Sequence, residues 1–225
     1  MSYDYCLWDI ETIPNESIKI DMPESFVKYG NTKLEDKRKV ILEKHQEDWD
    51  SNNEKAVKFK SLNPEFGQIV SSAIMVVSSR GEIISKDVFY DKETDIGIIE
   101  KTIENLKDRI IITWNGKGFD LPFLWKRSII NNTPLDFRFF NSMTKKYDFE
   151  KSIDLMHVWN DGGFGSQEKC CNALGFSSKS EMDGSKVYPA FKEGRHEDIK
   201  KYNMNDVEAM LEIANRIGII PKGLV

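Results

Sequence analysis

Two acidic residues close the first apolar segment of the chain, and their position limits what that segment can be. Residues 5–10 are aromatic and aliphatic, which favours a β-strand, and Pro14 ends it. Alternate residues of a strand lie on the same face, so Asp9 and Glu11 share the face of Leu7. The pattern therefore predicts a strand that carries two neighbouring carboxylates at its end. Taken alone, the pair is weak evidence for a functional site. The strand could simply end at this point, in which case both acids would be solvated.

A third carboxylate interrupts the apolar stripe of the helix expected at 196–217. The stripe follows steps of three and four residues, and Asp206 falls where an apolar residue is expected. Tyr202 lies one turn earlier on the same face. A buried carboxylate without a partner is costly, so Asp206 must be paired, solvated in a cleft or bound to a metal ion. Taken alone, the pair is better explained as a core tyrosine beside a salt-bridged aspartate.

A fourth carboxylate follows the short apolar strand expected at 110–113. Two glycines after this strand predict a tight turn, and Asp120 opens the helix expected at 120–130, with Pro122 in its first turn. An aspartate at that place can be a helix cap and nothing more. The glycines do not make a phosphate-binding loop, since neither G-x-G-x-x-G nor G-K-[ST] is present.

Together the three segments are expected to bring four carboxylates into one place. Clustered like charges repel one another and take up protons unless cations compensate them. Mg²⁺ and Mn²⁺ prefer such oxygen ligands, and two ions about 4 Å apart activate a water and stabilise the leaving oxygen of a phosphoryl displacement. The candidate metal ligands are Asp9, Glu11, Asp120 and Asp206.

The remaining segments predict a mixed α/β sheet with helices on both faces. Residues 69–77 and 82–90 have the pattern of a β-hairpin, and residues 94–106 that of a helix. Strands first, followed by alternation of strand and helix, indicate this architecture. Less regular structure is expected at 131–152 and at 176–194.

Residues 17–60 differ in character from the rest of the chain. Between Lys28 and Lys60 there are nine Lys or Arg and seven Asp or Glu, and the sparse apolar residues have roughly helical spacing. We interpret this segment as a charged helical insertion in a single domain that spans 1–225. For any one lysine in it, a solvated charged surface is the simpler explanation.

Charge and cysteine content limit the classes of protein to which this chain can belong. A net charge of −5 argues against a protein that coats nucleic acid by charge alone, but not against an enzyme that holds a polyanion at bound cations. No apolar run approaches the roughly 20 residues of a membrane span, and the N-terminus lacks the basic region of a signal peptide. Three cysteines make no disulfide framework, which favours a cytoplasmic location.

The motifs and their order resemble those of a known nuclease superfamily. D-x-E at 9–11, N-x-x-x-F-D at 115–120 and Y-x-x-x-D at 202–206 are similar to the three exonuclease motifs of the DEDD superfamily, and the tyrosine is typical of its DEDDy branch. The chain looks like the stand-alone relatives of the proofreading exonuclease domain of family-B DNA polymerases, and the likeness is weakest at 17–60. Further similar stretches are D-I-E-T-I-P at 9–14, L-N-P-E-F-G-Q-I-V at 62–70, I-D-L-M at 153–156 and M-D-G-S at 182–185.

This resemblance implies a ribonuclease H-like fold and 3′-5′ exonuclease activity with two divalent ions, Mg²⁺ or Mn²⁺, on the 3′ end of single-stranded DNA. It implies that the four carboxylates hold the metal ions. Tyr202 would orient the attacking water, since a phenol is a poor base but a good hydrogen-bond partner. Core packing explains Phe119 as well as a substrate contact does. The substrate contacts that the resemblance implies are Thr12, Asn115, Phe119 and Lys179.

Two other functions remain open at this point. An exoribonuclease would use the same metal chemistry, because discrimination between RNA and DNA rests on contacts to the 2′-hydroxyl. A nucleic-acid-binding module that accompanies a polymerase could use the fold without cutting. The presence of all four carboxylates and the tyrosine argues against such a module. Protein partners from replication or repair cannot be derived from the sequence.

Overall fold

A mixed β-sheet forms the centre of the molecule. The computed structural model describes residues 3–17, 21–145, 148–177 and 182–222. In this part of the chain a five-stranded sheet has the order β3-β2-β1-β4-β5. The central strand β1 pairs antiparallel with β2 and parallel with β4, so the sheet is mixed, as expected. Its strands are β1 (Tyr5–Pro14), β2 (Gly67–Val77), β3 (Ile83–Tyr90), β4 (Ile110–Thr113) and β5 (Ser152–Asp154).

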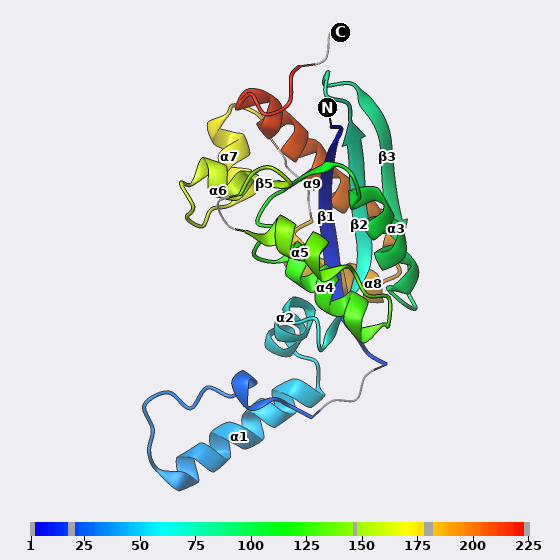
Figure 1. Ribbon diagram of the computed structural model, residues 1–225. Coiled ribbons are helices and arrows are strands. Elements are labelled where there is room, and N and C mark those ends of the chain that lie inside the picture. Colours follow the sequence, from blue (N-terminus) through cyan, green and yellow to red (C-terminus); the bar gives the residue numbers. More distant parts are fainter. Residues whose placement is uncertain (1–2, 18–20, 146–147, 178–181, 223–225) are drawn as a thin grey trace.

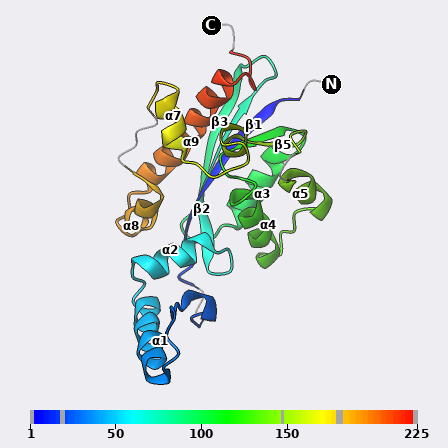
Figure 2. The ribbon, with the colours of Figure 1, turned by 90° about the vertical axis from the view of Figure 1, so that its left-hand side faces the viewer.

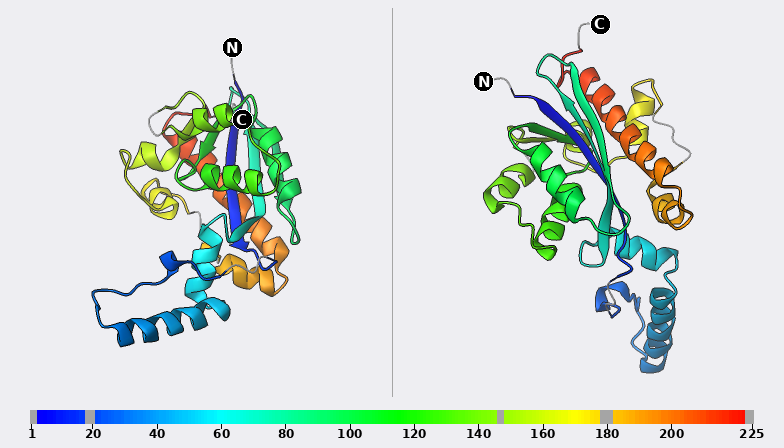
Figure 3. Two further views of the ribbon diagram at one scale, coloured as in Figure 1. Left: turned by 60° about the horizontal axis from the view of Figure 1, so that its bottom comes forward. Right: turned by 90° about the vertical axis from the view of Figure 1, so that its right-hand side faces the viewer.

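Helices cover both faces of this sheet, which confirms the predicted α/β fold class. The two helical layers are seen on either side of the strands in the right-hand view of Figure 3. None of the described helices is both long and apolar enough to cross a membrane. One layer contains α3 (Ile96–Leu106), α4 (Asp120–Ile130) and α5 (Phe137–Thr144). The other contains α6 (Leu155–Trp159), α7 (Gln167–Ala173) and α9 (His196–Arg216).

The alternation of side chains along β1 agrees with the sequence pattern. Trp8 and Ile10 lie in the core beneath α3 and α4, whereas Leu7 lies in the core beneath α9. The strand is longer than expected, because it continues to Pro14. Its register against β2 shifts between Glu11 and Thr12. Such irregularities re-aim side chains, and this one comes directly after the second acid of the strand.

Two expectations of irregular structure were wrong. The segment 131–152 contains α5, and the segment 176–194 contains the 3₁₀ turn Gly184–Lys186 and the helix α8 (Val187–Lys192). Both helices are short, so their sequences show little periodicity. The Asp136 side chain accepts hydrogen bonds from two backbone N–H groups at the start of α5, which stabilises the first turn.

The segment 17–60 is helical and extends away from the sheet. It contains the 3₁₀ turn Glu24–Phe26, the helix α1 (Glu35–Asp50) and most of α2 (Glu54–Leu62). Figure 1 shows α1 below the sheet and α2 between α1 and the end of β1. A small aromatic cluster holds the two helices together, with the ring of Trp49 5.3 Å from that of Phe26. Its place as an insertion in a single domain stays a prediction.

A buried ion pair fixes α4 to the rest of the fold. Arg127 of α4 donates two hydrogen bonds, of 2.7 and 3.0 Å, to the carboxylate of Asp95, and both side chains are almost fully buried. Asp95 also accepts a hydrogen bond from the backbone N–H of Ile69, at 3.1 Å. The pair therefore ties α4 to the start of α3 and to β2. No sequence pattern had indicated it.

We expect mutation of this ion pair to lower the free energy of unfolding more than mutation of an exposed pair on α4. Arg127→Met leaves the Asp95 carboxylate buried without its cation, which costs about 3–5 kcal/mol in the free energy of unfolding. Lys126→Met is a matched control, because the adjacent Lys126 pairs with Glu65 at 3.2 Å on the exposed surface. That change should cost no more than about 1 kcal/mol. Urea unfolding measures both; similar losses in the two variants would contradict a special role for the buried pair.

Candidate active site

Three carboxylates meet where β1 faces α9. One oxygen atom each from Asp9, Glu11 and Asp206 can be chosen so that all three lie within 4.8 Å of one another. Asp9 and Glu11 come from the same face of β1, and α9 packs across that face through its apolar residues. Glu11 is buried, whereas Asp9 and Asp206 are half-buried. The fold thus gathers side chains from the two ends of the chain into one acidic cluster.

Asp120 lies beside this cluster but outside the group of three. It is the first residue of α4, and its Oδ1 accepts a hydrogen bond of 3.2 Å from the backbone N–H of Ile10 on β1. Its charge raises the pKa of Asp9 and of Glu11, so the four carboxylates interact electrostatically. The helix start expected at Asp120 is confirmed, and the carboxylate is used in a contact to β1.

Negative charge on these four carboxylates is disfavoured by their surroundings. Burial raises the pKa of Asp9 and of Glu11 well above their usual values, and the neighbouring carboxylates raise both further. Burial also raises the pKa of Asp120 to about 7 and that of Asp206 to about 6. Among the described residues, the groups that lower these pKa values are hydrogen-bond donors and not cations. A set of crowded carboxylate oxygens without a cation of its own suits a hard divalent ion.

Tyr202 stands against the cluster as a protonated phenol. Its hydroxyl donates a hydrogen bond to the carboxylate of Asp206, one helical turn further along α9. Burial raises the pKa of Tyr202 far above its usual value, and Glu11, Asp206 and Asp9 add to this effect. The phenol therefore keeps its proton at neutral pH and acts as a hydrogen-bonding group.

Asn203 is a site residue that the sequence reasoning missed. It is fully buried, and its Nδ2 donates a hydrogen bond of 2.7 Å to Oδ2 of Asp9. Its Oδ1 accepts a hydrogen bond, also of 2.7 Å, from the hydroxyl of Ser71 on β2. One amide thus connects α9, β1 and β2 and fixes the orientation of Asp9. One feature of the sequence could have indicated it: Asn203 is a polar residue one helical turn after the apolar Ile199, on the face that packs against the core.

The buried stripe of α9 differs from the predicted one around Asn203. The stripe was expected to pass through Tyr202 and Asp206, but both are only half-buried. The fully buried positions are instead Asn203 and Val207, one residue later in each turn. Tyr202 and Asp206 therefore lie at the edge of the packed face. This position explains how a carboxylate can interrupt an apolar helix face without lying deep in the core.

A tight turn places Asp120, and a buried aspartate holds that turn. Asn115 has a left-handed backbone with φ of 62°, a conformation that asparagine tolerates better than most residues. A Cβ on Gly116 would lie 2.3 Å from the hydroxyl of Thr113, so only glycine fits there. Asp154, fully buried at the end of β5, accepts hydrogen bonds from the backbone N–H groups of Asn115 and Lys117 at 2.9 and 3.1 Å.

The residues expected to contact substrate are not equally placed to do so. The Thr12 hydroxyl donates its hydrogen bond to the backbone oxygen of Ser61 at 2.7 Å, which leaves only its acceptor capacity. Phe119 is half-buried, and its ring lies 5.4 Å from that of Phe123 in the core. Asn115 is half-buried in the turn before Asp120. Lys179 lies outside the described residues.

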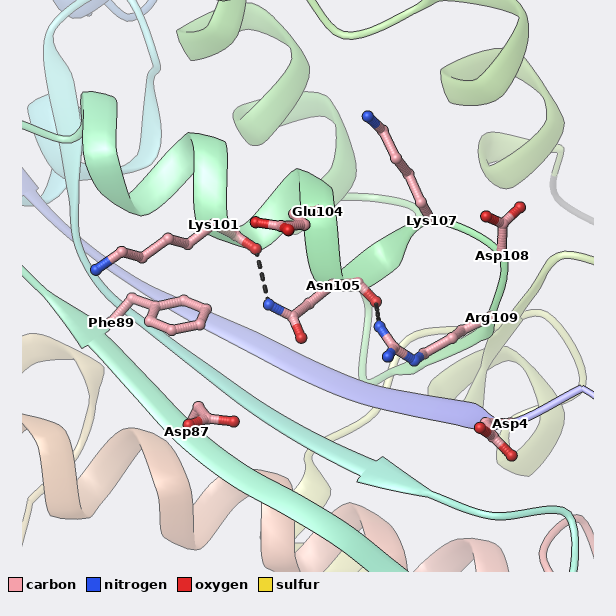
Figure 4. A pocket seen from close by; sticks show the side chains of 9 residues that line it. All are labelled: Asp4, Asp87, Phe89, Lys101, Glu104, Asn105, Lys107, Asp108 and Arg109. Atoms are coloured by element: carbon pink, nitrogen blue, oxygen red, sulfur yellow. Dashed lines mark hydrogen bonds between the residues drawn. The ribbon is translucent and has the colours of Figure 1, made fainter.

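A separate pocket of about 830 Å³ lies between α3 and β3, and none of its lining residues is an expected site residue. Figure 4 shows Lys101, Arg109 and Phe89 among the side chains around it. Its lining mixes acidic and basic groups, with Lys101 over the ring of Phe89 at 5.5 Å. This mixture offers no set of convergent ligands of one kind, so we assign no role to the pocket.

Solved structures with a similar fold include a polymerase and an exonuclease. The family B DNA polymerase of the hyperthermophilic archaeon Pyrobaculum calidifontis is 16% identical over 96% of this chain and 24% of its own, with a TM-score of 0.60. E. coli exonuclease I in complex with a dA16 oligonucleotide is 12% identical over 97% of this chain and 41% of its own, with a TM-score of 0.53. The chain therefore spans less than half of these proteins, and the likeness shows the ribonuclease H-like fold that the sequence predicted.

A comparison of sequences identifies the family. No curated protein matches the chain. Residues 58–210 match the family described as a predicted 3′-5′ exonuclease related to the exonuclease domain of PolB. This range contains Asp120, Tyr202 and Asp206 but begins after Asp9 and Glu11. Since it covers more than half of the chain, the protein belongs to the family of predicted 3′-5′ exonucleases related to the PolB exonuclease domain.

Proposed function

We propose that the protein is a 3′-5′ exonuclease that removes nucleotides from the 3′ end of single-stranded DNA with the help of two divalent metal ions. The observation that carries the proposal is the acidic cluster of Asp9, Glu11 and Asp206, with Asp120 beside it. Its oxygen atoms converge, its pKa values are raised, and the described groups around it supply hydrogen bonds but no cation. Family membership indicates the reaction, and the cluster indicates the cofactors.

In this proposal the four carboxylates hold Mg²⁺ or Mn²⁺. When bound, the ions would activate a water molecule and stabilise the charge on the phosphate and on the leaving 3′ oxygen. The bond from the water oxygen to phosphorus forms as the bond from phosphorus to the 3′ oxygen breaks, which releases a nucleoside 5′-monophosphate. The chain's own residues set the geometry. Asn203 holds Asp9 in place, and the protonated phenol of Tyr202 orients the attacking water without acting as a base.

The choice of DNA over RNA rests on the kinds of protein that share the fold. One of the similar structures is exonuclease I in complex with a dA16 oligonucleotide, and another is a DNA polymerase. An exoribonuclease stays the alternative, because the metal chemistry would be the same. The deciding contact would be one that accepts or rejects a 2′-hydroxyl.

Nucleotide release should depend on divalent metal ions and should proceed from the 3′ end. Matched single strands of DNA and RNA, labelled at the 3′ or the 5′ end, should show stepwise release of mononucleotides from the 3′ end with Mg²⁺ or Mn²⁺. EDTA should abolish this release, and Ca²⁺ should support little of it because its looser coordination positions water poorly. Full activity in EDTA would contradict the metal mechanism. Faster loss of the RNA strand would favour the exoribonuclease.

A second prediction separates the metal ligands from Tyr202. Asp9→Ala and Asp206→Ala should each remove nearly all turnover. Tyr202→Phe keeps the ring and loses only the hydroxyl, so we expect a loss of roughly 10²- to 10³-fold in kcat, as for one oriented polar group in other sites. Quenched-flow measurement of nucleotide release gives these rates. Full activity of Tyr202→Phe would make Tyr202 a core residue.

The same variants should differ in stability. Asp206→Ala relieves repulsion among the carboxylates, so its thermal midpoint in EDTA should rise above that of the parent chain. Asp9→Ala relieves repulsion as well, but it leaves the fully buried amide of Asn203 without its acceptor, which costs more than the loss of an acceptor for the half-buried Tyr202 hydroxyl in Asp206→Ala. The thermal midpoint of Asp9→Ala should therefore rise less than that of Asp206→Ala. Equal midpoints for all three proteins would mean that the charges are already compensated without metal.

The segment 17–60 is proposed to contact the phosphates of longer substrates. Its helix α2 packs against the end of β1, where Thr12 bonds to Ser61, so the base of the segment borders the cluster. An exposed basic run lies near the start of α1, and about 1.5 Å of rise per residue places it roughly 20 Å from Asp50 at the other end. Only a strand several nucleotides long can reach that far. The basic run is Lys37, Arg38 and Lys39.

Neutralising this run tests the proposal through salt dependence. The triple change Lys37→Gln, Arg38→Gln and Lys39→Gln should weaken the binding of long oligonucleotides and flatten the slope of log affinity against log salt by up to about 2. Cleavage of a dinucleotide should hardly change, because it cannot reach α1. Fluorescence anisotropy over a range of salt concentrations gives the slope. An unchanged slope would leave the run as a solvated surface, and an equal loss on short substrates would indicate a role in folding.

A further inference from the structure

An aromatic side chain is displayed on the loop between α6 and α7. Phe164 is 86% exposed, more than any other large apolar residue in the described part of the chain. Val158 and Trp159, just before this loop, are each 40% exposed. Single exposed apolar residues are ordinary, so the significance of Phe164 depends on where its loop lies. The flanking Gly163 and Gly165 have no side chains that could cover the ring of Phe164.

Internal contacts hold this loop in a fixed conformation. The backbone N–H of Gly162 donates to the oxygen of His157 at 2.8 Å, and that of Gly163 donates to the oxygen of Asn160 at 2.9 Å. The side-chain amide of Asn160 lies against Gly165 and donates a hydrogen bond of 3.0 Å to the oxygen of Met156. The exposure of the ring is therefore built into an ordered turn.

The loop is attached to the candidate active site on both sides of the ring. The oxygen of Gly165 accepts a hydrogen bond of 3.1 Å from the indole of Trp114, the residue directly before Asn115. The side-chain amide of Gln167 donates a hydrogen bond of 2.8 Å to the backbone oxygen of Asp206. Phe164 is three residues from Gln167, a span of at most about 11 Å. Figure 2 shows α7, which begins at Gln167, beside α9.

We infer that Phe164 stacks on a base of the single-stranded substrate, a few nucleotides from the scissile phosphate. This inference rests on the proposed exonuclease function and adds a base-binding subsite to it. Aromatic rings bind single strands in this way because every base has a π-face, so the contact requires no particular sequence. The loop itself carries Asp161 and no lysine or arginine between Asn160 and Gln167, so the contact is to the base and not to the phosphate.

The inference can be tested by binding in the absence of cleavage. In an Asp206→Asn background, Phe164→Ala should weaken a labelled single strand of about ten nucleotides roughly 5- to 150-fold, the range for loss of one stacked base. Phe164→Trp should retain the affinity. Phe137→Ala is a matched control, since Phe137 is 62% exposed on α5, and it should have no effect. Fluorescence anisotropy measures the dissociation constants.

Abasic substitutions show whether the ring meets a base. In the protein with Phe164, a strand that lacks the base at one particular position should bind more weakly than strands that lack another base. Phe164→Ala should bind the strand that lacks this base as well as it binds the others. DNA and RNA strands should show the same dependence, because stacking does not involve the 2′-hydroxyl. Unchanged binding by Phe164→Ala, as expected for a ring that docks a protein partner, would overturn the inference. Equal losses at every abasic position would overturn it as well.

Turnover of the unmodified chain separates this inference from the proposed function. If the chain releases nucleotides with Mg²⁺ or Mn²⁺ and Phe164→Ala binds normally, only the stacking subsite is wrong. If the chain releases none under any metal condition, the exonuclease proposal fails, whatever the binding data show.

Discussion

Repulsion between neighbouring carboxylates is the constraint around which this structure is arranged. Burial raises the pKa of Asp9 and of Glu11, and the charges of Asp120 and Asp206 raise both further, so the carboxylates would move apart if a rigid backbone did not hold them. The elements that carry these acids are held firmly. β1 is paired on both edges, and the amide of Asn203 holds Asp9 from the side of α9. The ion pair between Arg127 and Asp95 fixes the helix that carries Asp120.

Three aspartates of this protein have different surroundings. Asp95 has a guanidinium partner from the chain itself, and its role is to join helices. Asp154 has no guanidinium partner among the described residues but accepts hydrogen bonds from three backbone N–H groups, which shapes the turn before α4. Asp9 has one amide donor and three acidic neighbours. Of these three aspartates, Asp9 is the one whose charged neighbours are other carboxylates, and this difference separates structural acids from candidate ligands.

The sequence predicted the parts of the fold that depend on strong local patterns. Alternation along β1 and the glycine turn before Asp120 placed three acids correctly on their elements, because strand period and turn chemistry are local. Asn203 was not predicted, since its importance depends on Asp9 and Ser71, which reach it only in the folded chain. The short helices α5 and α8 were missed because one or two turns show no period; the Asp136 cap supports α5, and packing of Val187 and Ala190 supports α8.

The connection of the first strand to the last long helix also bears on how the protein is made. Asn203 and Asp9 are 194 residues apart in the chain and 2.7 Å apart in space. On the ribosome, β1 leaves the exit tunnel long before α9 exists, so its acidic face stays uncovered while most of the chain is synthesised. Contacts between distant residues form slowly because a long loop must close first. The acidic cluster is consequently a late product of folding, and a nascent or truncated chain without α9 would lack it altogether.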